Sequence, residues 1–118
     1  MEILRYSDLD VRGLEAQVER ATALLRKGDF RAADARKMMG SSFYRARLND
    51  KDRLLFRFVK HGGNSHLVLL EVIRNHAYEK SRFLNGAAVD EQKLEPLPDA
   101  AQIPPADILP LNFINPKN

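Results

Sequence analysis

The apolar positions of this chain change from a helical to a strand-like period near residue 43. Before that point, residues 2–6 form a brief apolar-rich run, which predicts a short strand. Apolar side chains then recur at steps of three and four over residues 11–25, and Gly28 follows them. This spacing predicts an amphipathic helix that ends near the glycine.

A second helix is predicted over residues 30–38. Asp29 can cap its start, several alanines favour the helical state, and Gly40 can stop it. Because the link between the two helices is short, we expect them to form an antiparallel hairpin.

Three strand-like runs follow the helices. Residues 43–48 and 52–59 are rich in aromatic and aliphatic side chains and are separated by a polar turn. The pair Gly62-Gly63 predicts a second tight turn, and the apolar run 67–73 then predicts a central strand that is covered on both faces. Strands joined by such short turns form an antiparallel meander.

The chain changes character again after the meander. Residues 74–86 have near-helical spacing and predict a short helix, whereas all six prolines lie beyond residue 95. We therefore expect a domain over residues 1–86 and a proline-rich tail or linker over residues 87–118. The tail contains an apolar patch at 108–114, which is suited either to docking on the domain or to joining a further domain after residue 118.

These elements predict the α+β class. The N-terminal strand should lie beside the three-strand meander in a four-stranded antiparallel sheet, with the two-helix hairpin packed across one face. The apolar stripe of residues 11–25 and the strand positions Leu54, Phe56 and Phe58 would form the two halves of the core.

The charge distribution is uneven, and it indicates the class of partner. The net charge is +3, and residues 41–86 carry nine Lys and Arg against four Asp and Glu. A basic segment of this kind favours an anionic partner such as RNA, DNA or an acidic protein. The alternative is a solvated sheet face with long basic side chains.

Composition and motifs exclude several classes of site. The chain has no cysteine, its three histidines lack metal-ligand spacing, and it contains no glycine-rich phosphate loop. We therefore expect neither a metal nor a cofactor. The sequence contains no apolar run of membrane-spanning length and no secretory signal, which predicts a cytoplasmic protein without membrane contact.

Two short stretches carry a resemblance to a known family. They are Arg53-Leu54-Leu55-Phe56 and Arg74-Asn75-His76-Ala77-Tyr78. In its order of elements and in these stretches, the chain resembles the RelE/ParE toxin superfamily over roughly residues 1–84. Members of that family begin a strand with arginine and end the last strand with an arginine or histidine cluster before a tyrosine. The similarity is greatest to the ribonuclease branch that keeps a histidine near its C-terminal end (YoeB-like).

The resemblance implies a metal-independent endoribonuclease of a toxin–antitoxin system that cuts mRNA on the ribosome. It assigns phosphorane stabilisation to Arg53 and Arg74, proton exchange to His76 and base positioning to Tyr78. Arginine binds phosphate through a planar fork and histidine exchanges protons near neutral pH, so these roles are chemically reasonable. The residues expected to line the RNA path are Lys37, Arg45, Arg47, Arg57 and Lys60.

The sequence departs from the family at one point. Some ribonuclease members use a glutamate as the base, and the corresponding region, residues 37–47, contains none, so that Lys37 is the nearest substitute. Two alternatives to the ribonuclease remain: a gyrase-targeting toxin of the ParE type, and a non-catalytic protein-binding or nucleic-acid-binding domain of a larger protein. An antitoxin is the partner implied for a toxin.

Overall fold

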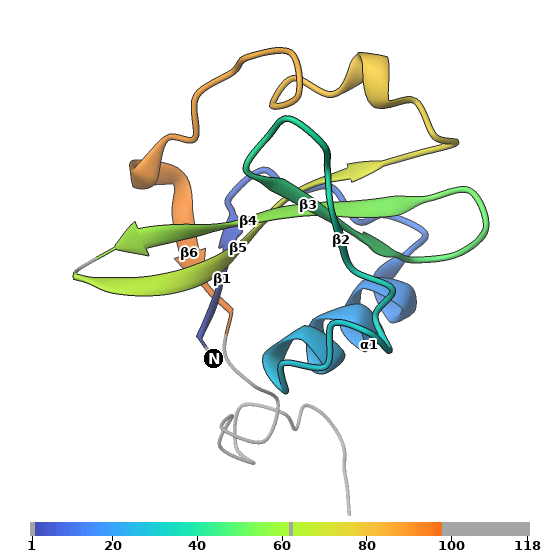
Figure 1. Ribbon diagram of the computed structural model, residues 1–118, viewed down its shortest axis with the longest axis horizontal. Coiled ribbons are helices and arrows are strands. Elements are labelled where there is room, and N and C mark those ends of the chain that lie inside the picture. The colour runs from blue at the N-terminus through green and yellow to red at the C-terminus, as the bar shows by residue number, and fades with distance from the viewer. Residues whose placement is uncertain (1, 62, 98–118) are drawn as a thin grey trace, which may run out of the picture.

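The single α-helix of the described chain packs below a six-stranded sheet, and residues 74–90 run above it (Figure 1). The computed structural model describes residues 2–61 and 63–97. Its elements are β1 (Ile3–Tyr6), α1 (Glu15–Arg26), β2 (Arg36–Lys37), β3 (Phe43–Arg47), β4 (Arg53–His61), β5 (Asn64–Ile73), the 3-10 helices η1 (Tyr78–Lys80) and η2 (Glu91–Lys93), and β6 (Leu94–Pro96). The predicted α+β class is confirmed.

The sheet has the strand order β2-β3-β4-β5-β1-β6. Strands β3, β4 and β5 form the predicted antiparallel meander, and β1 lies beside it as expected. The prediction of four antiparallel strands was wrong, because β1 runs parallel to β5 and the short strands β2 and β6 extend the two edges. The sheet is therefore mixed, with six strands.

Strand β5 is the central strand that the apolar run predicts. Residues 67–70 have no solvent exposure, so this strand is covered on both faces. Near its middle, Leu55 pairs with Glu71 while Phe56 pairs with Leu69, so Leu70 is an extra residue in β5. This β-bulge places Leu70 and Glu71 toward the same face of the sheet.

Helix α1 begins later than its apolar stripe suggests and ends where predicted. Gly13, with φ +79°, turns the chain immediately before the helix. At the other end, Gly28 takes φ +77°, its N–H donates to the Leu25 carbonyl, and the next N–H donates to the Leu24 carbonyl. This is a Schellman motif, which ends helices at a left-handed glycine.

The second helix predicted over residues 30–38 does not form. Asp29 caps one turn through the Ala32 N–H, but Asp34 takes φ +50° and the chain then joins the sheet as β2. Phe30 packs with α1 on one face of the sheet and Met38 packs on the other. One short helix cannot place both side chains in this way, so tertiary packing overrides the local alanine preference.

The helix predicted over residues 74–86 is also largely absent. Only η1, three residues long, is helical there. Asn75 and His76 take φ +55° and +56°, and the Ala77 N–H donates to the Arg74 carbonyl at 3.0 Å. Two successive left-handed residues closed by this bond form a type I′ turn, which is incompatible with a right-handed helix.

Two hydrophobic cores lie on opposite faces of the sheet. The first core joins α1 to the sheet, and its buried members are Ile3, Leu9, Leu14, Val18, Ala21, Leu25, Ala33, Ala46, Leu48, Leu54, Phe56, Leu67 and Leu69. The second core lies between the sheet and the segment after β5, and its buried members are Leu4, Tyr6, Leu55, Val68, Leu70, Ile73 and Phe83. Leu54 and Phe56 face α1 as predicted, whereas Phe58 remains 36% exposed.

The segment assigned to the tail contributes to the sheet in its described part. Strand β6 pairs antiparallel with β1, and Leu97 packs against the first core. The rest of the predicted tail, including the patch at 108–114, lies outside the described residues. In the part of the chain that is described, no helix has the length and apolar character needed to cross a membrane.

Replacement of Phe56 by alanine tests the first core. The Phe56 ring is fully buried and stacks on Tyr44 with ring centroids 5.4 Å apart, so Phe56→Ala should lower the free energy of unfolding by about 3 to 5 kcal/mol. The matched control, Phe58→Ala, lies on the same strand and face but is partly exposed, and it should cost less than half as much. Urea denaturation of both variants measures the difference, and equal losses would contradict this account.

Candidate nucleic-acid interface

Strands β3 and β4 place four arginines in register on the face of the sheet opposite α1. Three of them, Arg45, Arg53 and Arg57, have no ion pair with a described carboxylate, whereas Arg47, which pairs with Arg53, is bound by Asp50. Cross-strand pairing sets this arrangement, because directly paired residues project to the same face. Arg45 pairs with Leu55, Arg57 with Val68, and Arg53 with Ile73. All three partners belong to the second core. We call Arg45, Arg53 and Arg57 the arginine face.

None of these three arginines forms an ion pair with a carboxylate of residues 2–61 or 63–97. Arg36 on the neighbouring strand β2 projects to the same face, since it pairs with Arg45, but it is bound by Asp34 at 3.1 Å. The arginine face therefore has positive charge that is not neutralised by its described neighbours.

Tyr78 connects the segment above the sheet with the arginine face. Arg45 Nη1 donates to the Tyr78 hydroxyl oxygen at 3.3 Å, and the Tyr78 ring packs against the second core. The position of η1 is fixed by Ser81, a buried residue whose hydroxyl donates to the Glu71 carboxylate at 2.6 Å. Packing and hydrogen bonding thus hold Tyr78 beside Arg45.

His76 is exposed and lies in an unusual backbone conformation. Its ring centroid is 6.4 Å from that of Tyr78. Its Nε2 lies 2.9 Å from the Asp50 carbonyl oxygen, and its backbone N–H donates to the Lys51 carbonyl at 3.0 Å. Because a carbonyl can only accept, Nε2 carries the hydrogen, and Nδ1 is the ring atom left for proton exchange. A left-handed histidine costs conformational energy, which is frequently observed at functional sites.

Arg53 is held by its own turn. Its Nη1 donates to the carbonyls of Asn49 and Asp52 at 2.6 and 3.0 Å. The Asp52 carboxylate accepts hydrogen bonds from the Asn49 side chain at 2.9 Å and from the Asn75 N–H at 3.0 Å. Asp52 therefore ties the turn that holds Arg53 to the turn that carries His76. These two bonds, that of Asn49 first, lower the pKa of Asp52 below its ordinary value.

Arg57 lies over an aromatic ring. Its guanidinium carbon is 5.3 Å from the centroid of Phe43, within the range of a cation–π contact. Its Nε is buried without a hydrogen-bond partner, and no described residue bonds to its terminal nitrogens. Arg57 is therefore held by a ring and not by a carboxylate.

The other predicted site residues lie elsewhere, except Arg47, which pairs with Arg53 across the two strands but is neutralised by an ion pair. Arg74 is directed to the loop before α1, where its Nη2 donates to the Arg12 carbonyl at 2.9 Å. Lys37 pairs with Tyr44, and Lys60 follows Val59 in β4, so both belong to the face that carries α1. Arg47 forms an ion pair with Asp50. The structure thus brings Arg45, Arg53, Arg57, His76 and Tyr78 to one side of the sheet and separates Arg74, Lys37 and Lys60 from them.

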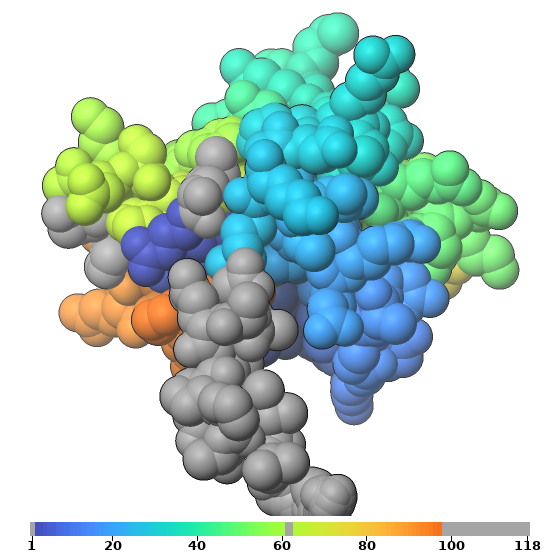
Figure 2. Space-filling view, turned by 90° about the horizontal axis from the view of Figure 1, so that it is seen from below, coloured from blue at the N-terminus to red at the C-terminus, as the bar shows by residue number. Residues whose placement is uncertain are grey.

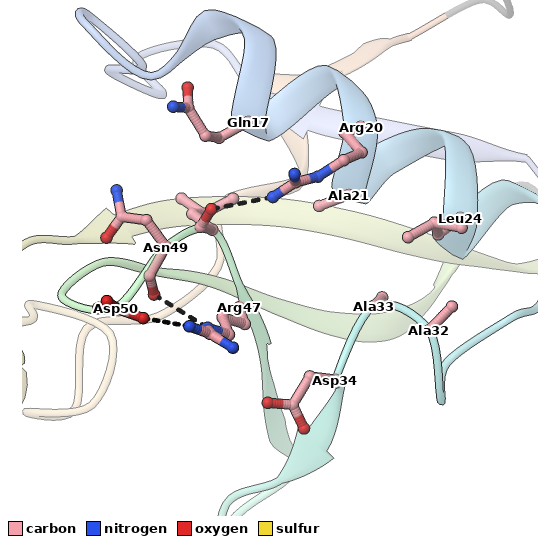
Figure 3. A pocket seen from close by; sticks show the side chains of 11 residues that line it. Gln17, Arg20, Ala21, Leu24, Ala32, Ala33, Asp34, Arg47, Asn49 and Asp50 are labelled. Carbon is pink, nitrogen blue, oxygen red and sulfur yellow. Dashed lines mark hydrogen bonds and ion pairs between the residues drawn. The ribbon is translucent and has the colours of Figure 1, made fainter.

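A wide depression of about 640 Å³ lies on the side of the sheet that carries α1, between α1 and the β3–β4 turn. Figure 3 shows Arg20 bonded to the Leu48 carbonyl on one side and Arg47 bonded to Asp50 and to the Asn49 carbonyl on the other. Figure 2 shows this side of the molecule, where α1 and the turn after it form a continuous surface. Because Asp50 neutralises Arg47 and Asp34 also lines the depression, it is less suited to anions than the arginine face.

Asp52 and Asn49 are positioning residues that the sequence pattern did not reveal as such. The polar run 49–52 was interpreted only as a turn, and the bond from Asp52 to Asn75 joins segments 23 residues apart. A signal was present, because Asn and Asp side chains often bond to backbone N–H groups two or three residues ahead. Asn49 does so here with Lys51 and Asp52.

Comparisons with known protein families, with curated proteins and with solved structures find no match for this chain. The site must therefore be judged on its own chemistry. Among residues 2–61 and 63–97, no group of three histidine, aspartate or glutamate side chains is placed to hold a metal ion. The arginine face and its neighbours Phe43, His76 and Tyr78 offer guanidinium, phenyl, imidazole and phenol groups, which suit phosphates and nucleobases.

Neutralising Asp52 should loosen the connection between the two turns. The pKa of Asp52 is lower in the folded protein than the ordinary value of 3.8, so its stabilising effect is complete above that value and is lost as the pH falls through the folded pKa. Asp52→Asn should therefore be less stable than the wild type by about 1 kcal/mol at pH 7, and the difference should shrink as the pH falls below 3.8 and the carboxylate becomes protonated.

Urea denaturation of both proteins between pH 7 and pH 2 measures this difference. Glu19→Gln, which removes an exposed carboxylate on α1, is the control and should show little difference at any pH. A difference between wild type and Asp52→Asn that does not change with pH would rule out a role for the carboxylate charge.

Proposed function

We propose that this chain is a RelE-like domain that binds an RNA strand on its arginine face. The observation that carries the proposal is the projection of Arg45, Arg53 and Arg57 from two adjacent strands to the same face, without an ion pair to any described carboxylate. Unpaired guanidinium groups are strong ligands for phosphate, because their planar forks match its oxygen atoms.

Aromatic groups on the same face favour a nucleic acid over a simple anion. Tyr78 contacts Arg45, and Phe43 lies beneath Arg57. Single-stranded nucleic acids are commonly bound by surfaces that combine basic groups for the phosphates with aromatic rings for the bases. The mixture of charge and aromatic surface on β3, β4 and η1 has this character.

Loss of Arg45 should weaken RNA binding and reduce its dependence on salt. Arg45→Ala should lower the slope of log affinity against log salt concentration by about 0.7, the value for one phosphate contact to a single strand. Fluorescence anisotropy with a labelled single-stranded RNA at several salt concentrations measures both quantities.

The control for Arg45→Ala is Lys27→Ala, which removes one positive charge at the exposed end of α1 on the opposite face of the sheet. This variant should bind like the wild type. If the two variants weaken binding equally, only the net charge matters, and the proposed interface is wrong.

RNA cleavage is a second candidate, and the geometry of His76 favours it. The imidazole is exposed, its Nδ1 is left for proton exchange, and it is close to Tyr78 and hence to Arg45. In the mechanism that the family resemblance implies, the RNA 2′-oxygen forms a bond to the adjacent phosphorus and the bond from that phosphorus to the 5′-oxygen breaks. The histidine takes the proton of the 2′-hydroxyl, and water supplies a proton to the leaving 5′-oxygen. Arg53 and Arg45 are the nearby groups that could neutralise the phosphate. In this reading the substrate is mRNA on the ribosome, and an antitoxin protein would be the regulatory partner.

If the site cleaves RNA, His76 is the residue whose loss should be most informative. His76→Ala should slow cleavage by about two to four orders of magnitude, the usual contribution of a general acid or base, whereas Tyr78→Phe, which keeps the ring, should cost much less. Cleavage should also persist in EDTA, because the proposed step needs no metal.

Primer extension on transcripts induced in a bacterium detects the defined ends that cleavage on the ribosome leaves. The triple variant Arg53→Ala, Arg74→Ala, His76→Ala, verified as folded, is the stringent test. If its ends match those of the wild type, the cleavage is not performed by this site. If the wild type itself produces no ends, the chain is a binding domain without this activity.

A further inference from the structure

We propose that Arg57 and Phe43 form a nucleobase subsite, in which a base of a single-stranded RNA stacks on the guanidinium group of Arg57. This proposal rests on the proposed function and adds to it a preference for unpaired bases. It assigns Arg57 a role different from that of Arg45, which would bind phosphate.

The first observation is that Arg57 has no hydrogen-bond or ion-pair partner among the described residues. Its Nε is buried and makes no hydrogen bond, and none of its nitrogens bonds to a described residue. A buried donor without a partner destabilises the folded state, so such groups are rare in native proteins and require an explanation. A ligand-binding role is a reason to keep an arginine in a place where it does not contribute hydrogen bonds to the fold.

The second observation is the ring beneath it. Phe43 pairs directly with Arg57 across β3 and β4, and the guanidinium carbon lies 5.3 Å from the centre of the ring. The ring lies against one side of the guanidinium group, and the Phe43 side chain is itself half-buried against the second core. Arg57 is only half-buried, so a flat ligand that reaches its guanidinium group would stack on the side away from the ring. Bases of single-stranded RNA stack on arginine planes in this way as well as on aromatic rings.

The third observation is the relation to Arg45. Phe43 and Arg45 are two residues apart on β3 and project to the same face, so Arg57 and Arg45 are diagonal neighbours. Diagonal positions on adjacent strands lie about 7 to 8 Å apart. A nucleotide can therefore place its base on Arg57 while an adjacent phosphate reaches Arg45. A base in a duplex is already stacked and paired, so it cannot reach the guanidinium group unless the base pair opens.

The test distinguishes the effect of the positive charge of Arg57 on RNA binding from the effect of its planar guanidinium group. Arg57→Lys keeps the positive charge but removes the planar group, and Arg57→Gln removes the charge. The two probes are a labelled single-stranded RNA and a strand of the same length whose ribose–phosphate backbone carries no bases. The wild type should bind the base-bearing strand about tenfold more tightly than the abasic strand, and Arg57→Lys should abolish this difference while the salt dependence stays unchanged.

Arg36→Lys is the matched control, since it replaces an arginine on the same face that is paired with Asp34. It should keep the preference for the base-bearing strand. Thermal denaturation adds a readout that a structural role would change. Arg57→Lys keeps a positive charge near Phe43 and loses no hydrogen bond from the buried Nε, so its melting temperature should stay close to that of the wild type, whereas Arg57→Gln should lose only the weak cation–π contact.

The outcomes distinguish this subsite from the proposed function. If the wild type binds both strands equally, or if Arg57→Lys keeps the tenfold preference, the base subsite is wrong, whereas the effect of Arg45→Ala still supports the RNA interface. A large drop in melting temperature for Arg57→Lys, with the preference retained, would show that Arg57 serves the fold. If the wild type binds neither strand, the RNA interface and the subsite fail together.

Discussion

Burial of β5 on both faces is the constraint on which the rest of the structure depends. Its residues 67–70 are inaccessible to solvent, and each successive side chain contributes to a different core. A strand of this kind needs a layer on each side, because its apolar side chains would otherwise contact water. Helix α1 supplies one layer. The other is supplied by the segment after β5, whose Phe83 and Tyr78 pack down on the sheet.

The candidate interface is a consequence of how far that second layer extends. Its buried residues cover β1 and β5 and reach Leu55 on β4, whereas Arg45 and Arg57 occupy positions on β3 and β4 that are only half-buried. Polar side chains at these positions need no partner from the fold as long as they reach solvent or a ligand. The arginine face thus begins where the hydrophobic covering ends, and Tyr78 marks the boundary between them.

Positioning at this boundary depends on short hydrogen bonds and not on regular secondary structure. Asp52 joins the turn before β4 to the turn after β5, and Ser81 is anchored on Glu71, a residue placed on this face by the β-bulge. The left-handed conformation of His76 is maintained by contacts with Asp50 and Lys51. Strained residues persist when the surrounding bonds determine their conformation, which is the arrangement a site needs if its groups are to be preorganised.

The sequence by itself determined the elements whose local pattern agrees with their tertiary environment. The helix predicted from the apolar stripe forms over residues 15–26, Gly28 ends it, and the three strand runs form the meander, because periodicity and burial indicate the same state at these positions. The helical preference of the alanines at residues 32–35 was misleading, because Phe30 and Met38 pack into cores on opposite faces of the sheet.

Only the tertiary structure decided the parallel pairing of β1 with β5, since hydrogen bonding between distant strands leaves no local pattern. It also separated Arg74 from Arg53 and brought Arg45, Arg57 and Tyr78 together, because the face on which a side chain lies depends on strand register.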